Sequence, residues 1–394
     1  MSHTPSLPVS PSLSPPQVAL WPATANLPAS PATHQAASGV VWGSAQRAED
    51  FSQWLASIAA DQSLDPASVR VAAADAGFRR YLRVDSLAGA KGKAASRIIM
   101  DAPPDKEDCA GFVKIAQLLT DAGLLTPKVL AWDVSRGFML LTDLGAHTMM
   151  AHIEPNNANA NLPRYQQATD ALLQLQTASA PNVLPAYDAA LLHRELALFP
   201  DWYVAKHKGF ALSDTQRHTI DSAFALIVQR NLDAPSVYVH RDFMPRNLML
   251  SEAGRLGVLD FQDAVYGPIS YDIASLMRDA FLTWDEDFVL DVTIRYWEKA
   301  RKLGLMDYQG WAQDFGAFYR AVEWMGLQRH LKVAGIFARL TLRDGKAKYL
   351  ADAPRFIHYI RTTCNRYREL GPLLKVIDEI EGTENAVAWS FGRI

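Results

Sequence analysis

Hydrophobic residues in the first part of the chain follow a pattern typical of short strands. Apolar runs occupy Tyr81 to Val84, Ile98 to Met100 and Phe138 to Thr142. Runs this short, bounded by polar or turn-forming residues, predict strands rather than helices. Between the last two, a helix is expected to begin at Pro103-Pro104-Asp105 and to end at Gly123. Its expected apolar face is Phe112, Ile115, Leu118 and Leu119.

After Gly145 the hydrophobic pattern becomes helical. Helices are expected over Tyr165 to Thr177 and over Thr215 to Gln229, and the pattern breaks once, over Val237 to Phe261, into short β-like runs. One buried helical stripe is expected at Trp311, Phe315, Phe318, Val322 and Met325. The sequence therefore predicts an α+β protein with a small strand-rich lobe over residues 46–145 and a larger, mainly helical lobe over residues 146–394.

Residues 1–45 differ in composition from the rest of the chain. Residues 1–38 hold eight of the 22 prolines, seven serines and seven alanines, and the first Asp, Glu, Lys or Arg is Arg47. Such a segment cannot bury enough apolar surface to order itself, so we expect a disordered tail. The alternative is that translation starts further along. A helix is expected after Gly43, with Phe51, Leu55 and Ile58 on one face.

Composition excludes several classes of function. The chain carries 39 Lys and Arg against 42 Asp and Glu, a net charge of -3, which predicts no binding to nucleic acid or to an anionic membrane. Cys109 and Cys364 are too far apart for a zinc motif, and two cysteines suit a reducing cytoplasm. The sequence contains no run of 18 apolar residues, so no membrane-spanning helix is predicted. The oligomeric state stays open, a monomer included.

The stretch from Val239 to Phe261 carries the most informative chemistry. Asn247 opens one apolar run and Asp260 closes the next, with the turn-forming Ser251 to Arg255 between them. Two such runs are expected to pair as an antiparallel hairpin, which brings residues at its open end to roughly 5 Å apart at their Cα atoms. One carboxylate and one amide oxygen would then face the same point and suit Mg²⁺.

Asp242 lies five residues before Asn247, on the loop that leads into the hairpin. A carboxylate at this place can accept the proton of a hydroxyl held beside a metal-bound phosphate. The arrangement predicts phosphoryl transfer from a nucleotide to an alcohol. Each residue alone could be a turn former, but the three in this order favour catalysis.

His240-Arg241-Asp242 with Asn247 matches the H-R-D-x-x-x-x-N loop of kinases, and Leu259-Asp260-Phe261 stands where kinases carry their magnesium-binding aspartate. Gln262 replaces the glycine of D-F-G, and no A-P-E follows. The chain resembles the aminoglycoside and choline phosphotransferase superfamily, which has a two-lobed, protein-kinase-like fold. The resemblance implies that Asp242 is the catalytic base and that Asn247 and Asp260 bind Mg²⁺.

Further segments are similar to the cell-wall amino-sugar kinases, which phosphorylate N-acetylmuramate and N-acetylglucosamine at the anomeric carbon. They are Ala76 to Tyr81, Met100 to Pro104, Leu140 to Gly145, Leu198 to Trp202 and Arg329 to Lys332. The resemblance covers about Phe51 to Arg361. It implies ATP as the phosphoryl donor, with adenine bound at Thr142, Asp143 and Leu144.

The strand that carries a lysine in kinases has none here, since Arg97 to Asp101 reads R-I-I-M-D. Arg79 and Arg80, beside the single glycine Gly77, are candidates to bind the nucleotide phosphates instead. The alternative is that both are solvated strand charges. His240 and Arg241 are expected to hold the catalytic loop in place rather than to react.

Substrate residues are harder to assign. Arg329, in a basic cluster expected at the end of a buried helix, could pair with a lactyl carboxylate, or could instead interact with the helix dipole. Trp202 could stack on a sugar ring. Glu195 and Asp263 are the candidates for an acidic pocket if the substrate is a cation. Asp272 resembles an aspartate that follows the metal motif in the superfamily, but it is expected instead to cap a helix over Ile273 to Phe281.

The site residues predict phosphoryl transfer to a small hydroxyl-bearing molecule, and the resemblance implies that the enzyme uses ATP and Mg²⁺ and that its substrate is an amino sugar salvaged from peptidoglycan. Two alternatives stay open at this point: a phosphotransferase for an aminoglycoside, choline or an amino-acid hydroxyl, and an inactive nucleotide-binding module, motivated by the missing strand lysine.

Overall fold

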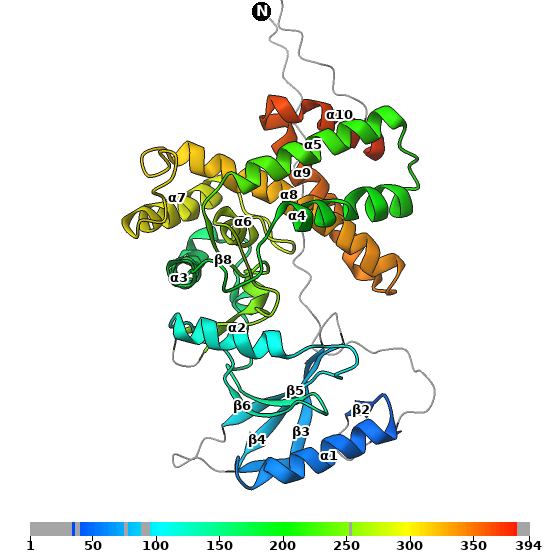
Figure 1. The fold of residues 1–394 in the computed structure, drawn as a ribbon, viewed down its shortest axis with the longest axis vertical. Helices are drawn as coiled ribbons and strands as arrows, with labels where there is room; N and C mark the ends of the chain where they lie inside the picture. Colours follow the sequence, from blue (N-terminus) through cyan, green and yellow to red (C-terminus); the bar gives the residue numbers. More distant parts are fainter. Residues whose placement is uncertain (1–33, 36–39, 75–77, 88–94, 252–253, 384–394) are drawn as a thin grey trace, which may run out of the picture.

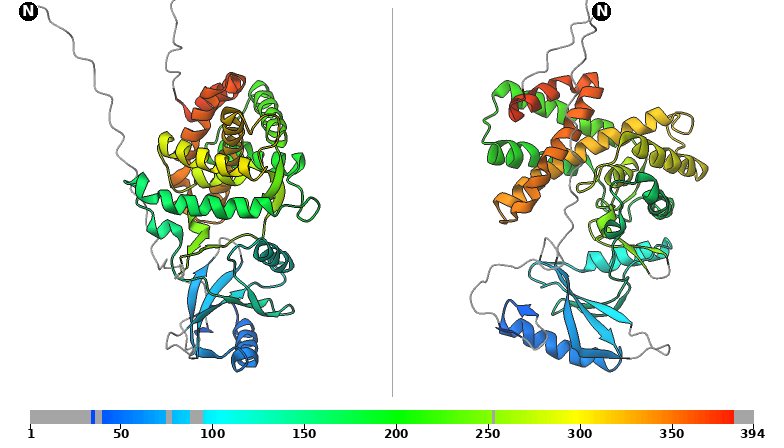
Figure 2. Two further views of the ribbon diagram at one scale, coloured as in Figure 1. Left: turned by 90° about the vertical axis from the view of Figure 1, so that its left-hand side faces the viewer. Right: turned by 180° about the vertical axis from the view of Figure 1, so that it is seen from behind.

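The computed structural model describes residues 34–35, 40–74, 78–87, 95–251 and 254–383. These residues form two lobes, one built on a five-stranded sheet and the other mainly of helices (Figures 1 and 2). The expected two-lobed α+β architecture is confirmed. Within the described residues no helix is long and apolar enough to span a bilayer.

The small lobe is an antiparallel sheet with the strand order β3-β4-β5-β7-β6. Its strands are β3 (Leu64–Ala74), β4 (Arg80–Ser86), β5 (Ser96–Asp101), β6 (Val129–Asp133) and β7 (Phe138–Thr142). The sequence predicts β4, β5 and β7 but not the other two. The edge strand β3 contains Pro66 and three consecutive alanines, and its pairing shifts register between Asp65 and Arg70, so it lacks the usual strand signal.

One helix lies against each face of this sheet (Figure 1). The outer helix α1 (Ala45–Ala59) starts where expected, with Ser44 accepting the Arg47 backbone N–H at 3.1 Å. The inner helix α2 (Ala110–Asp121) starts later than expected, because the Pro103 carbonyl accepts the Lys106 N–H and closes a turn first. It ends as predicted before Gly123, whose φ of +85° suits glycine.

The ordered part of the small lobe begins earlier than the composition suggests. The strand β2 (Val41–Trp42) pairs with β1 (His34–Gln35), and Val40 and Trp42 lie in the core under α1. The predicted tail boundary at residue 45 is therefore too late. The rest of the predicted tail, residues 1–33 and 36–39, lies outside the described residues.

The large lobe consists mainly of helices. They are α3 (Ala158–Thr177), α4 (Ala189–Leu196), α5 (Asp214–Leu232), α6 (Ser270–Met277), α7 (Glu286–Lys302), α8 (Phe315–Leu342), α9 (Ala353–Arg366) and α10 (Gly371–Glu381), with the π-helical segment η2 (Phe199–His207) and the 3₁₀ turns η1 (Met149–His152), η4 (Ala347–Asp352) and η5 (Arg368–Leu370). The expected helices over 165–177 and 215–229 are confirmed as α3 and α5.

The long central helix α8 differs from the prediction in two ways. Trp311 is buried but lies before the helix begins, and its ring packs edge-on against Phe318 at 5.6 Å. The basic cluster of Arg329, His330 and Lys332 does not end the helix, which runs on to Leu342. These three residues are buried in its middle, so a helix-terminal dipole does not explain them.

A continuous hydrophobic core connects the two lobes. The inner face of the sheet, with Met100, Met139 and Leu141, belongs to the same buried cluster as α3, α6 and α8. The outer face, with Ile99 and Leu140, packs under α1 in a separate cluster. Adjacent residues of β5, and likewise of β7, therefore pack into two different hydrophobic cores.

Two short antiparallel strand pairs flank the loop that contains Asp242 in the large lobe. Strand β8 (Ser236–Val239) pairs with β11 (Val265–Pro268), and β9 (Leu248–Leu250) pairs with β10 (Leu256–Val258), which confirms the expected hairpin. The 3₁₀ turn η3 (Pro245–Asn247) precedes β9. The hairpin also bonds to the segment after β7, because the Leu250 N–H donates to the His147 carbonyl at 3.0 Å.

Candidate active site

The hairpin brings Asp242, Asn247 and Asp260 together. The Leu259 N–H donates to the Asn247 carbonyl at 2.9 Å, so Asn247 lies opposite the start of the Asp260 segment. Nδ2 of Asn247 is 3.3 Å from Oδ2 of Asp260 and donates to the backbone carbonyl of Asp242 at 2.8 Å. One amide side chain thus connects the other two predicted residues.

Two residues of this site have backbone conformations that L-amino acids seldom adopt. Arg241 has a φ of +75° and Asp260 a φ of +63°. Such positions cost of order 1–3 kcal/mol and persist where surrounding contacts determine them. Gln262, which replaces the glycine of the kinase motif, donates from Nε2 to Oδ1 of Asp260 at 2.9 Å and so fixes that carboxylate.

Asp272 fixes the loop of Asp242 through hydrogen bonds to its backbone. It lies inside the first turn of α6 and not before a helix, so the expected N-cap role is wrong. Its carboxylate accepts the backbone N–H groups of His240 at 2.7 Å and Arg241 at 3.0 Å. Burial raises the pKa of Asp272 to about 6, although the two N–H donors and nearby positive charge oppose that rise.

His240 is a structural residue of the loop. Its Nε2 is 2.9 Å from the Leu259 carbonyl, and its Nδ1 lies 3.3 Å from the Asp242 N–H. These partners fit a neutral ring that donates from Nε2 and accepts at Nδ1. Burial lowers the pKa of His240, which keeps the ring neutral.

A buried charge network surrounds Asp242. Glu195 pairs with Arg241 and accepts from the Tyr187 hydroxyl, and Nζ of Lys332 lies 3.0 Å from its Oε1. Burial alone would raise the pKa of Asp242, but the positive charges of Lys332 and Arg329 outweigh it, so that the pKa is lowered. Asp242 is therefore ionised and able to accept a proton at neutral pH.

Asn247 and Asp260 form a donor set that fits Mg²⁺. Because Nδ2 of Asn247 donates to the Asp242 carbonyl and lies 3.3 Å from Oδ2 of Asp260, the amide oxygen is the side-chain atom left to bind a cation. Mg²⁺ binds proteins through one or two such oxygens and keeps waters and phosphates as its other ligands.

The predicted nucleotide residues are held by different partners. Arg80 on β4 pairs with Asp101 at 2.7 Å and stacks over the Trp42 ring at 4.0 Å. Arg79 lies 3.9 Å from Glu107, in the loop before α2. Gly77 lies outside the described residues.

In the predicted adenine segment, Asp143 accepts from Arg83 at 2.6 Å and from the Ser96 hydroxyl at 2.6 Å. The Thr142 hydroxyl accepts the Lys128 N–H at 2.9 Å, and Leu144 is half-buried beside Gly257. The roles of these residues toward a nucleotide stay predictions.

The four predicted substrate residues lie in different environments. Glu195 is buried among cations and Asp263 is exposed beside Asp260. Trp202 on η2 is half-buried, with Nζ of Lys206 3.6 Å above its ring. Arg329 is only 2% exposed, and it donates to the Arg241 carbonyl at 2.9 Å and to the Tyr271 hydroxyl.

Sequence reasoning missed the structural partners Tyr187 and Tyr271, for which no local signal exists. It also passed over Arg246, although this residue is part of the catalytic loop and directly precedes Asn247.

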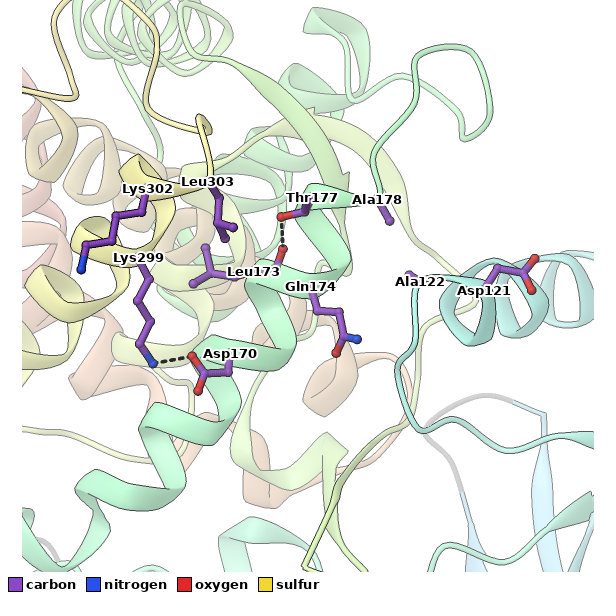
Figure 3. A pocket seen from close by; sticks show the side chains of 10 residues that line it. All are labelled: Asp121, Ala122, Asp170, Leu173, Gln174, Thr177, Ala178, Lys299, Lys302 and Leu303. Carbon is purple, nitrogen blue, oxygen red and sulfur yellow. Dashed lines mark hydrogen bonds and ion pairs between the residues drawn. The ribbon is translucent and has the colours of Figure 1, made fainter.

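An open pocket of about 700 Å³ lies elsewhere, between the end of α2, α3 and the end of α7 (Figure 3). The Lys299–Asp170 ion pair crosses it, and Leu173 and Leu303 give it apolar surface. None of the predicted site residues lines this pocket, so it is separate from the candidate active site.

Comparison with known proteins gives consistent matches. Residues 68–312 match the family described as "Phosphotransferase enzyme family". An N-acetylmuramate/N-acetylglucosamine kinase of Neisseria meningitidis is 46% identical, over 86% of this chain and 97% of that protein. The kinase of the same name from Pseudomonas aeruginosa is 46% identical, over 81% and 90%.

Solved structures of low identity share the fold. An ethanolamine kinase of Plasmodium vivax aligns with a TM-score of 0.53 and 12% identity, over 77% of this chain and 82% of that one. A choline kinase of Streptococcus pneumoniae aligns with a TM-score of 0.51 and 12% identity, over 80% and 99%.

Proposed function

The chain belongs to the phosphotransferase enzyme family, and from this premise we propose that it transfers the γ-phosphoryl group of ATP to the anomeric hydroxyl of N-acetylmuramate and N-acetylglucosamine. The observation that carries the proposal is the grouping of Asp242, Asn247 and Asp260 in one hydrogen-bonded site. The similarity to amino-sugar kinases over most of the chain supports the choice of substrate. The product would serve peptidoglycan recycling in the cytoplasm.

In this reaction Asp242 accepts the proton of the attacking hydroxyl. The carboxylate stays ionised because Lys332 and Arg329 place positive charge near it. An anomeric hydroxyl is more acidic than a primary one, so a single carboxylate suffices as the base when transfer is in progress. His240, Arg241 and Asp272 keep the loop in position and do not exchange protons.

Asn247 and Asp260 would hold Mg²⁺, which neutralises the charge of the transferring phosphoryl group when it is bound. Of the two predicted arginines, Arg79 is the better candidate for the nucleotide phosphates, because Arg80 pairs with Asp101 and lies over Trp42, and Thr142 to Leu144 are the candidates for adenine. Both assignments rest on the resemblance of these segments to kinases.

A cationic substrate such as choline or an aminoglycoside is less well supported. It would need uncompensated carboxylates near Asp242. Glu195 already pairs with Arg241 and Lys332, and it accepts from Tyr187. Asp263 alone is then available from the predicted acidic pair.

The test is to incubate the purified protein with ATP, Mg²⁺ and each of N-acetylmuramate, N-acetylglucosamine, choline and an aminoglycoside, and to assign the phosphorylated position by ³¹P and ¹H NMR. We expect the 1-phosphate of both amino sugars. A 6-phosphate would overturn the proposed position of transfer. Transfer to choline or the aminoglycoside alone would overturn the proposed substrate.

A further inference from the structure

Arg246 is an exposed cation within the catalytic loop itself. It lies in the 3₁₀ turn η3, directly before Asn247 and four residues after Asp242. Its guanidinium lies 4.8 Å over the ring of Phe281, in the loop between α6 and α7. Within the part of the chain that the structure describes, Arg246 makes no ion pair and no side-chain hydrogen bond. Its exposed guanidinium is therefore available to bind an anion from solvent.

The other cations around the loop are already engaged. Arg241 pairs with Glu195, and Lys332 lies 3.0 Å from the same carboxylate. Arg329 is buried, and its guanidinium bonds to the Arg241 carbonyl. These three cations therefore already make contacts that hold the loop of Asp242 in place.

The charges next to Arg246 favour an anion there. Lys348 on η4 is exposed, and its pKa is lowered, by partial burial first and then by the positive charge of Arg246. The neighbouring acid Asp279 is fully buried and accepts the Phe281 backbone N–H at 2.8 Å, and burial raises its pKa to about 6 against the opposing effect of that N–H and of the positive charges of Arg329 and Arg246. It makes no ion pair with Arg246.

The short spacing of Asp242 and Arg246 along the loop allows one acidic amino sugar to contact both residues. Four residues span at most about 14 Å, and the turn that the Asn247 N–H closes onto the Met244 carbonyl shortens this path. A sugar whose anomeric hydroxyl is presented to Asp242 carries its lactyl ether two ring carbons away, so that its carboxylate can approach a long side chain on the same loop. A planar guanidinium binds a carboxylate through two parallel N–H bonds.

We propose that Arg246 binds the lactyl carboxylate of N-acetylmuramate and so determines how well the enzyme uses the acidic sugar. This inference rests on the proposed function. It moves the role that the sequence suggested for Arg329 to a residue that is exposed and has no ion-pair partner among the described residues.

The experiment compares both sugars in steady-state kinetics with wild type, Arg246→Gln and Arg246→Lys. Arg301→Gln is the matched control, because Arg301 is also exposed and also lies 4.8 Å over an aromatic ring, that of Trp297 on α7. The amide of N-acetylmuramate, which lacks the charge, completes a double-mutant cycle.

In Arg246→Gln the ratio of kcat/KM for N-acetylmuramate to kcat/KM for N-acetylglucosamine should fall about ten- to hundredfold, the effect of losing a charge-assisted contact. Arg246→Lys should fall between. The amide should be used equally by wild type and Arg246→Gln. Activity on N-acetylglucosamine also shows that each variant is folded.

Equal losses on both sugars, or no loss on either, would overturn the role of Arg246. If the wild type phosphorylates neither sugar, the proposed function itself fails. The two failures are therefore distinguishable.

Discussion

The proposed role of Asp242 as the base depends on its charge, since Asn has nearly the same shape but cannot accept the proton. Asp242→Asn is expected to lower kcat by about 10²- to 10⁴-fold, the usual effect of a positioned general base. The backbone carbonyl of residue 242 would still accept from Asn247, so the hairpin and ATP binding should be kept. Turnover assays and calorimetry with ATP check both parts. Near-normal turnover would remove Asp242 from the mechanism.

The two neighbouring arginines of the small lobe should separate into two roles. Arg80 is bound to Asp101, donates to the Val41 carbonyl and stacks on Trp42, so Arg80→Gln should mainly lower the free energy of unfolding. Arg79 lies 3.9 Å from Glu107 and is the remaining candidate for the nucleotide phosphates, so Arg79→Gln should raise the KM for ATP about ten- to hundredfold.

Kinetics against ATP and urea unfolding of both variants decide the matter. If the KM for ATP is unchanged in both, the phosphates are bound elsewhere, and Lys106 and Lys114 are the next residues to test.

The middle of α8 shows why some elements could be predicted and others could not. Local signals were sufficient where a few neighbouring residues decide the structure, as in the β9–β10 hairpin, the end of α2 at Gly123 and the loop holding Asp242 and Asn247. They failed where distant partners decide it. From the sequence, Arg329 was expected at a helix end and available to a substrate carboxylate. It is instead buried in the middle of α8, where it donates to the Tyr271 hydroxyl and the Arg241 carbonyl.

The same holds for Asp272, which reads as a cap but binds two N–H groups about 30 residues earlier. Strand β3 is stabilised by its pairing with β4, although Pro66 and the run of three alanines weaken its own strand signal. The grouping of Asp242, Asn247 and Asp260 was therefore more predictable than the distant side chains that hold their loop in place.

His330, also on α8, should make stability depend on pH. Burial, and then the charge of Arg329, lower its pKa to about 3. Below its ordinary value near 6.5 the unfolded chain takes up a proton that the folded protein does not, so acidification favours unfolding. Between pH 7 and pH 5 the wild type should lose about 2 kcal/mol relative to His330→Gln.

Urea unfolding of both proteins at pH 7, 6 and 5 measures this difference. The raised pKa values of Asp272 and Asp279 act in the opposite direction, but they are common to both proteins and cancel. A constant difference across this range would show that His330 is not responsible.

At the scale of the whole molecule, the shared core predicts cooperative unfolding. Strands β5 and β7 direct Met100 and Met139 into the large-lobe core, and Ile99 and Leu140 into the core under α1. Loss of the sheet would therefore expose apolar surface in both lobes. Scanning calorimetry should show one transition with equal calorimetric and van't Hoff enthalpies. Two separate transitions would mean that the lobes unfold independently.

The burial of Trp42 has a practical consequence for anyone who shortens the protein for crystallisation or NMR. Composition suggests cutting near residue 46, but that fragment would uncover Phe51, whose ring lies 4.7 Å from that of Trp42, and would leave Arg80 without its aromatic partner. Exposed aromatic surface of this kind promotes self-association at the concentrations those methods need. A fragment that begins at or before Val40 keeps Trp42 against Phe51 and Arg80. Poor solubility of a fragment that begins near residue 46 would therefore reflect the choice of first residue and not a property of the enzyme.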